Sequence, residues 1–518
     1  MPGVGEPPTG VTEEHEPQAA ETEVHHGNQF LKILRHGSWY FVASVLTKLA
    51  GLVLVPIYTR YLSPAEYGIL GSLDAVMRLL PMFLSLYLDA SFIRFYYADR
   101  RVSHERVRRL YSTQFWFVLV WGLGVTALGL AIAPYTIQKV VDVPFMPFMP
   151  LVFAAPLLTQ LGIMGSQIMR ADLKAREVSL INLLSFVATA SVALILLIPF
   201  GYGVESLLWG LTAGPFVTFV IFTAIALRTR VLGWVFDWPT LRRSLQFSIP
   251  LIPNVAGGWI NGFSNRLVLA HYGTLADVGL FTISAQLGYL MYFLTDAVTQ
   301  VQNPIAMSAL TADTEAGKRQ ISEFLSVFLW TALAFFLLLT LFSEEVLILL
   351  TPPAYHEAYT LVAIFALAYI AGAIYRVFTV VLMYRRLLWV IGSGAVVSAV
   401  LNVVLMFALI PGLGRPAAAV AFLVSTATYA AWLAWWSQHA ERVPLNWRVL
   451  GPTVAATTAV LGAYVALELA EVDAAVAVAV KLALMAGYLG LIFVVPGMRP
   501  LRAGVGNQLR AVVARVRS

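Results

Sequence analysis

The segment FLSVFLWTALAFFLLLTLF, from Phe324 to Phe342, decides the fold class of this chain. It contains no charged residue, and its length matches the roughly 20 residues that an α-helix needs to cross the hydrocarbon core of a bilayer. Such a helix would be apolar on all of its faces, so water is a poor solvent for it. The segment therefore predicts a membrane-spanning helix.

Similar apolar segments recur along the whole chain. Of its 518 residues, 59% are hydrophobic and 12% are charged, whereas a soluble globular chain has about 25% charged residues. Because backbone groups in lipid need hydrogen-bond partners within the protein, helices are expected. The sequence predicts an all-α, polytopic membrane protein of about fourteen transmembrane helices. The apolar runs lie at about 38–60, 68–97, 113–134, 148–169, 179–200, 204–227, 247–270, 277–301, 324–342, 358–383, 387–410, 417–436, 449–467 and 474–495.

Lysine and arginine gather in every second connection between these runs. If the residues before the first run lie inside, the inside connections include the arginine-rich segments 100–109, 228–243 and 499–517, whereas the outside connections hold only Arg60, Lys139 and Arg415. Cationic connections are retained on the cytoplasmic side of a membrane. Both termini are therefore predicted to be cytoplasmic.

The chain ends and the composition exclude several other classes. Residues 1–30 are polar and have no apolar stretch typical of a signal peptide, so they are predicted to form a disordered cytoplasmic tail. The sequence has no cysteine, which excludes disulfides and thiolate metal sites. No metal or cofactor is predicted. The net charge of +6 follows from the basic connections, and no nucleic-acid partner is expected.

A short internal repeat divides the chain. The segment YLSPAEYGIL at 61–70 matches YGTLADVGLF at 272–281, 211 residues later, and shares Tyr, Ala, an acid and Gly in register. The acid of each copy is expected at the amino end of the next helix, where the helix dipole favours it. An even number of helices per unit gives parallel repeats. Six-helix lobes are therefore predicted at 31–230 and 240–440, followed by two extra helices at 445–497 and a basic cytoplasmic tail at 498–518.

Some charged residues fall inside the apolar runs. An ionised side chain at bilayer depth costs several kcal/mol, so these residues are expected to face a protein-lined or water-filled cavity. Most of them lie on the first two helices of each predicted lobe, which indicates a central cavity between the lobes. They are Lys48, Asp74, Arg78, Asp89, Arg94, Arg266, Asp296, Arg376 and Lys481.

Several of these charges also have structural interpretations. Asp74 and Arg78 are four residues apart on one helical face and can neutralise each other. Arg94 can extend to the cytoplasmic interface, and a kink at Pro81 would help it. Lys481 is assigned a structural or lipid-contacting role. Lys48 and Arg266 are the hardest to explain in this way and are the favoured anion contacts.

Enzyme motifs are missing from the sequence. It contains no glycine-rich phosphate loop, no zinc-binding helix motif and no nucleophile elbow, and its predicted external loops are short. A transporter is therefore favoured over an enzyme.

Four segments carry motifs of a known family. They are LSPAEYGIL at 62–70, LDASFIRFYY at 88–97, the block 248–287, which contains SIPLIP, Trp259, Asn265-Arg266 and Gly279-Leu280-Phe281, and the region 402–421 with IPGLG. Together they resemble the polysaccharide transporter family, the O-antigen-type oligosaccharide flippases of the multidrug, oligosaccharidyl-lipid and polysaccharide exporter superfamily.

This resemblance implies a fold, a function and a site. Two lobes in a V would alternate between two open states while an undecaprenyl-pyrophosphate-linked oligosaccharide crosses the bacterial cytoplasmic membrane, in O-antigen, lipopolysaccharide or other surface polysaccharide biosynthesis. Asn265 stands where the family commonly has an acid, which either frees Arg266 to attract an anion or weakens a structural ion pair. The site implied in the central cavity comprises Lys48, Asp74, Arg78, Asp89, Arg94, Asn265, Arg266 and Arg376.

Other functions remain open at this stage. A cation-coupled multidrug antiporter of the same superfamily would prefer an acidic cavity, and a lipid II-type flippase or a non-transporting membrane scaffold are further alternatives. The expected partners of a flippase are the lipid-linked oligosaccharide, membrane lipid, a coupling ion (proton or sodium) and glycosyltransferases or a polymerase.

Overall fold

The computed structural model describes residues 51, 53–311, 315–442, 444–470 and 472–494. Within these residues the chain is helical and has no strand, and 12 helices are long and apolar enough to cross a membrane. They are α2 (Pro64–Leu84), α4 (His104–Ile132), α6 (Phe148–Ala171), α7 (Ala175–Leu197), α8 (Val204–Arg228), α12 (Leu275–Thr311), α13 (Glu315–Leu350), α14 (Tyr359–Tyr384), α15 (Leu388–Leu413), α16 (Arg415–Ala440), α17 (Trp447–Leu469) and α18 (Ala474–Val494). The predicted all-α membrane fold is confirmed, with fourteen as an approximate helix count.

Two predicted runs differ from single spanning helices. The run 68–97 is divided into α2 and α3 (Leu88–Arg100), and Leu86 and Tyr87 between them have positive φ values of 48° and 60°. The run 247–270 is divided into η2 (Ile249–Leu251), α10 (Ile252–Gly262) and α11 (Ser264–Tyr272). Most of the first run, 38–60, lies outside the described residues.

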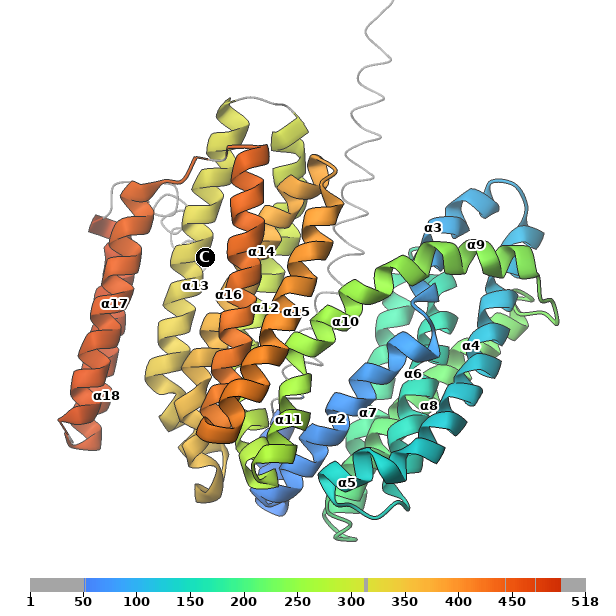
Figure 1. The fold of residues 1–518 in the computed structure, drawn as a ribbon, viewed down its shortest axis with the longest axis horizontal. Coiled ribbons are helices and arrows are strands. Elements are labelled where there is room, and N and C mark those ends of the chain that lie inside the picture. Colours follow the sequence, from blue (N-terminus) through green and yellow to red (C-terminus); the bar gives the residue numbers. More distant parts are fainter. Residues whose placement is uncertain (1–50, 52, 312–314, 443, 471, 495–518) are drawn as a thin grey trace, which may run out of the picture.

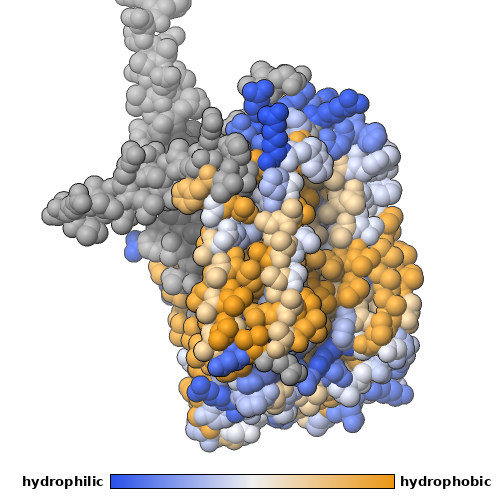
Figure 2. Space-filling model, turned by 90° about the vertical axis from the view of Figure 1, so that its left-hand side faces the viewer, coloured by the Kyte–Doolittle hydropathy of each residue, from blue (hydrophilic) through white to orange (hydrophobic). Residues whose placement is uncertain are grey.

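The helices form two groups arranged in a V (Figure 1). The N-terminal group contains α2 to α8 and the C-terminal group contains α12 to α16, while α17 and α18 pack on α13 at the edge. The amphipathic helix α9 (Trp238–Ser248) packs on α3 and α4, whereas α10 packs on α15. The surface on the side of α17 and α18 has a broad apolar band between two polar ends, as a bilayer requires (Figure 2). The exact domain boundaries given above stay predictions.

The two groups meet where α2 and α12 begin, and the two copies of the repeat make this contact. A Cβ atom on Gly68 would overlap the carbonyl oxygen of Leu275, and a Cβ on Gly279 would overlap the carbonyl oxygen of Pro64. Each glycine thus lets the other helix approach to backbone contact. We call this reciprocal contact the crossing. It lies at the narrow end of the V.

Matching caps begin the two crossing helices. Ser63 accepts from the backbone of Glu66, and the Glu66 carboxylate accepts from the Ser63 backbone at 2.8 Å. Thr274 and Asp277 repeat this arrangement at α12, with backbone bonds of 3.3 and 3.1 Å. These reciprocal bonds are capping boxes. They confirm that the acid of each copy lies at the amino end of its helix.

Two tyrosines bond across the narrow end. The Tyr355 hydroxyl donates to the carbonyl of Leu62 at 2.9 Å, and the Tyr67 hydroxyl donates to Gln286 Oε1 at 3.1 Å. The two rings also meet edge to face, with centroids 6.0 Å apart. Directional bonds therefore supplement backbone packing at this end, which holds the two groups in one register.

Candidate functional site

The facing sides of α2 and α12 carry polar and aromatic groups beyond the crossing. Helix positions three or four residues apart share one face. On α2 this spacing leads from Gly71 to Asp74 and Arg78, and on α12 it leads from Thr282 to Tyr289 and Asp296. With Phe263 between α10 and α11, and with neighbouring groups from α11 and α14, they form what we call the interlobe wall. Its members are Asp74, Arg78, Phe263, Arg266, Tyr289, Tyr292, Asp296, Tyr369 and Arg376.

Asp74 and Arg78 form an ion pair within α2. Arg78 Nε lies 2.7 Å from Asp74 Oδ2, which is the mutual neutralisation that the sequence left open. The Arg78 side chain is still 54% exposed, and its guanidinium lies 4.8 Å from the centroid of the Phe263 ring. A pair so exposed contributes little to stability. Arg78 therefore keeps donors available to a ligand.

Arg266 lies just after the break between α10 and α11. Its side chain is 7% exposed, and Nη1 donates to the carbonyl of Gly262 at 3.1 Å. The guanidinium lies 5.4 Å from the centroid of Phe263 and 5.7 Å from that of Phe281. Among the described residues no carboxylate oxygen lies within 4.0 Å of it. The broken helix thus places a nearly buried cation on the same aromatic ring as Arg78.

Asn265 does not take the place of an acidic partner. It is 1% exposed, and its amide nitrogen donates to the carbonyl of Asn261 at 3.1 Å. Its Oδ1 is buried without a hydrogen-bond partner. Asn265 is therefore a buried polar group of the broken helix and supplies no charge against Arg266.

Arg376 of α14 extends the wall further from the crossing. Its Nη1 donates to Asp296 Oδ1 at 3.0 Å, and its guanidinium lies 4.4 Å from the centroid of the Tyr292 ring. Tyr292 stacks in parallel on Tyr289, with centroids 4.8 Å apart, and Tyr369 meets Tyr289 edge to face at 5.5 Å. Aromatic rings therefore connect this second ion pair with the arginines near the crossing.

Other predicted site residues lie elsewhere. Asp89 and Arg94 are on α3, beyond the break in the second run, and Arg94 covers the ring of Phe247 on α9 at 4.6 Å. No contact of either residue with Asp74 or Arg266 is seen among the described contacts. Lys48 lies outside the described residues. The assignment of these three residues to the cavity stays a prediction.

Lys481 is buried at the edge of the C-terminal group. Its side chain is 3% exposed and its Nζ lies 2.8 Å from Glu345 of α13, with Glu344 and Glu468 at 4.0 and 3.8 Å. This network joins α18 to α13 and α17. It agrees with the structural role assigned to Lys481 from the sequence.

The aromatic members of the wall were missed by the sequence analysis. Phe263, Tyr289, Tyr292 and Tyr369 are ordinary residues for an apolar run, and attention to charges alone passes over them. The available signal was the spacing of Tyr289, Tyr292 and Asp296, which places an aromatic pair and an acid on one helical face.

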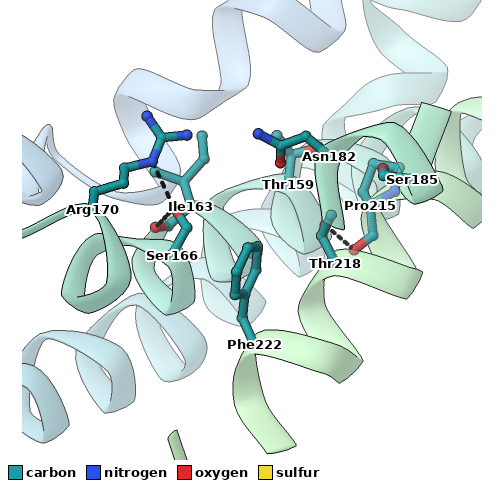
Figure 3. A pocket seen from close by; sticks show the side chains of 10 residues that line it. Thr159, Ile163, Ser166, Arg170, Asn182, Ser185, Pro215, Thr218 and Phe222 are labelled. Carbon is teal, nitrogen blue, oxygen red and sulfur yellow. Dashed lines mark hydrogen bonds between the residues drawn. The ribbon is translucent and has the colours of Figure 1, made fainter. Parts of the chain in front are cut away.

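A cavity of about 160 Å³ lies within the N-terminal group, between α6, α7 and α8 (Figure 3). Thr159, Asn182 and Ser185 line it, and Arg170 at one side donates through Nε to the Ser166 hydroxyl at 3.1 Å. No acidic residue lines it. None of the members of the interlobe wall belongs to it, so it is a separate feature.

A buried acid after α16 binds two cations. Glu441, just after α16, is bound by Lys318 of α13 at 2.9 Å and by Arg385 after α14. The hydrogen bond from Lys318, followed by that from Arg385, holds the pKa of the Glu441 carboxyl below its usual range.

No group of three or more metal-ligating side chains occurs in the part of the chain that the structure describes.

The family follows from comparison with known sequences. The family model described as "Polysaccharide biosynthesis protein" matches residues 57–360. The chain belongs to this polysaccharide biosynthesis family. The matched residues include α2, α11 and α12, and therefore the crossing and most of the interlobe wall. No curated protein sequence matches the chain.

Solved structures share the fold of this family member. A lipid II flippase, MurJ, in an inward closed conformation is 12% identical, with a TM-score of 0.68 over 88% of this chain and 98% of that one. An inward-facing multidrug resistance transporter of the MATE family is 13% identical, with a TM-score of 0.56 over 75% and 93%. A transporter of the same superfamily from Pyrococcus furiosus is 15% identical, with a TM-score of 0.53 over 79% and 95%. At these identities the likeness shows the fold alone: this family member is a multi-pass membrane protein with the architecture of these transporters.

Proposed function

We propose that the protein moves a lipid-linked oligosaccharide, carried on undecaprenyl pyrophosphate, from the inner to the outer leaflet of a bacterial cytoplasmic membrane. The pyrophosphate and any acidic sugars would bind the arginines of the interlobe wall, while the lipid tail remains in the bilayer. The observation that carries the proposal is the nearly buried Arg266, which shares the Phe263 ring with Arg78 and has no carboxylate within 4.0 Å among the described residues.

The charge balance of the wall supports an anionic ligand. Three arginines face two aspartates, and Asp74 and Asp296 are each already bound by an arginine. A buried arginine without a carboxylate is costly in a medium of low dielectric constant, and an arriving phosphate would lower that cost. A cationic drug would find no such compensation at this wall. These charges therefore favour the flippase over the multidrug antiporter.

The shape of the molecule supports alternating access. The arginine-rich connections 100–109 and 228–243 lie at the wide end of the V, which supports a cytoplasmic location for that end. A substrate would reach the wall from this end while the crossing closes the other. Separation of α2 from α12 at the crossing, with closure of the wide end, would release the substrate outside. A proton or sodium gradient would drive the cycle, and glycosyltransferases would supply the substrate.

Deletion of the gene tests the proposal. The deletion strain should accumulate lipid-linked oligosaccharide, which mass spectrometry of extracted lipids measures directly, and wild-type protein should clear it. Arg266→Gln should fail to clear it at equal protein level, because Gln keeps hydrogen-bond donors but loses the charge. Arg228→Gln, at the exposed carboxyl end of α8, is the matched control and should behave like wild type. A normal lipid pool together with greater sensitivity to cationic drugs would favour the antiporter instead.

A further inference from the structure

The stacked pair Tyr289 and Tyr292, with Arg376 and Asp296 beside it, is a group that the binding of pyrophosphate does not require. We infer that this group is a sugar-binding subsite, in which Tyr289 packs against the ring of the sugar next to the pyrophosphate. The inference rests on the proposed function and specifies which part of the ligand each part of the wall contacts. We call the four residues the tyrosine platform.

The first step is the exposure of the Tyr289 side chain. Tyr292 is covered by Tyr289, whose ring is parallel to within 5°, and by the guanidinium of Arg376 at 4.4 Å. Tyr289 is on the same face of α12 as Thr282 and Gln286, which contact α2. Its side chain is nevertheless 39% exposed. A tyrosine placed only to fill a core would be covered. Tyr289 instead offers aromatic surface beside the arginines.

The second step is rigidity. Tyr369 and Phe293 meet the Tyr289 ring edge to face, with centroids 5.5 and 4.8 Å away. These contacts fix the plane of the ring, and tyrosine has few rotatable bonds to lose on binding. The platform is therefore preorganised for a flat partner, which lowers the entropic cost of association.

The third step is the chemistry of a sugar ring. A pyranose presents an apolar C–H face and a rim of hydroxyl groups, so it needs an aromatic surface below and hydrogen-bonding groups at its edge. Asp296 accepts from hydroxyl groups and Arg376 donates to them, and their 3.0 Å bond holds both in place. A phosphate without a sugar has no apolar face that could pack on the aromatic surface. The combination thus fits a glycan.

The fourth step is the spacing along α12. Arg266 Nε contacts Thr282, and Tyr289 follows two turns later, about 10 Å along the helix axis. A pyrophosphate held by Arg78 and Arg266 would therefore place the attached sugar at the platform.

Binding measurements on the full-length protein in lipid nanodiscs test this inference. The two probes are the lipid-linked oligosaccharide extracted from the deletion strain and undecaprenyl pyrophosphate without sugar. Wild type should bind the first more tightly. Tyr289→Ala should weaken binding of the first by about tenfold, equivalent to about 1.4 kcal/mol, and leave binding of the second unchanged. Tyr289→Phe, which keeps the ring, should retain the preference.

Two further variants complete the design. Tyr289→Leu keeps apolar volume without an aromatic ring and should behave like Tyr289→Ala even if the alanine variant folds poorly. Tyr202→Ala removes a tyrosine of comparable exposure from the N-terminal group and should bind both probes like wild type. Equal binding of the glycan probe by wild type, Tyr289→Ala and Tyr289→Leu would overturn the platform while leaving the flippase intact. Absence of any accumulated lipid in the deletion strain would overturn the proposed function itself.

Discussion

The crossing between α2 and α12 should control which end of the molecule is open. A Cβ on Gly68 would overlap the carbonyl group of Leu275, so Gly68→Ala strains only the state in which the two helices touch. Overpacking of this kind costs about 1–3 kcal/mol. The equilibrium between the closed and the separated crossing should therefore shift toward separation by about fivefold to 150-fold. The reciprocal contact predicts the same shift for Gly279→Ala, where the overlap is with Pro64.

Labelling of an introduced cysteine measures this shift. The chain has no natural cysteine, so Thr282→Cys, buried at 6% exposure beside Gly71, is a unique target for an impermeant thiol reagent added from outside the cell. Labelling of Thr282→Cys should be slow when Gly68 and Gly279 are both present. Adding Gly68→Ala or Gly279→Ala should raise the labelling rate by about fivefold to 150-fold. Gly210→Ala is the control, because its Cβ would meet the backbone of Thr189 within one group. Unchanged labelling with both crossing variants would refute the assignment of the crossing as the closed gate.

Two predictions concern stability. Lys481→Met leaves Glu345 and its neighbours without their buried cation, so the free energy of unfolding should fall by about 3 kcal/mol or more, seen as a lower melting temperature of the solubilised protein. Glu441 has a folded-state pKa below its ordinary 4.5 because Lys318 and Arg385 bind the carboxylate, so it stabilises the fold above pH 4.5 and loses that contribution as the pH falls. Glu441→Gln should remove this acid sensitivity of the melting temperature, and identical pH profiles of the two proteins would contradict the assignment.

The class of fold was accessible from the sequence because lipid demands apolar residues on all sides of a spanning helix. The two breaks were not. Pro81 permits an interruption, but Leu86 and Tyr87 are residue types that rarely adopt the positive φ values found there. Near the division at Phe263, the Trp259 indole donates to the carbonyl of Ala75 at 2.8 Å, a contact between distant segments that the local sequence does not indicate.

The candidate site was accessible in part for a related reason. A charge such as Arg266 stands out in an apolar run because burial makes it costly, whereas Tyr289 is unremarkable there until its neighbours in space are known. The repeat indicated that Gly68 and Gly279 are equivalent. Only the structure showed that each contacts the other copy of the repeat.

Transfer of the lipid between leaflets tests the central claim most directly. Vesicles would contain the purified protein and the lipid-linked oligosaccharide extracted from the deletion strain, and an impermeant glycan-cleaving enzyme would be added outside under a proton or sodium gradient. Wild type should make the inner-leaflet glycan accessible, while Arg266→Gln and protein-free vesicles should leave it protected. A glycan that stays equally protected with wild-type protein under either gradient would contradict the account.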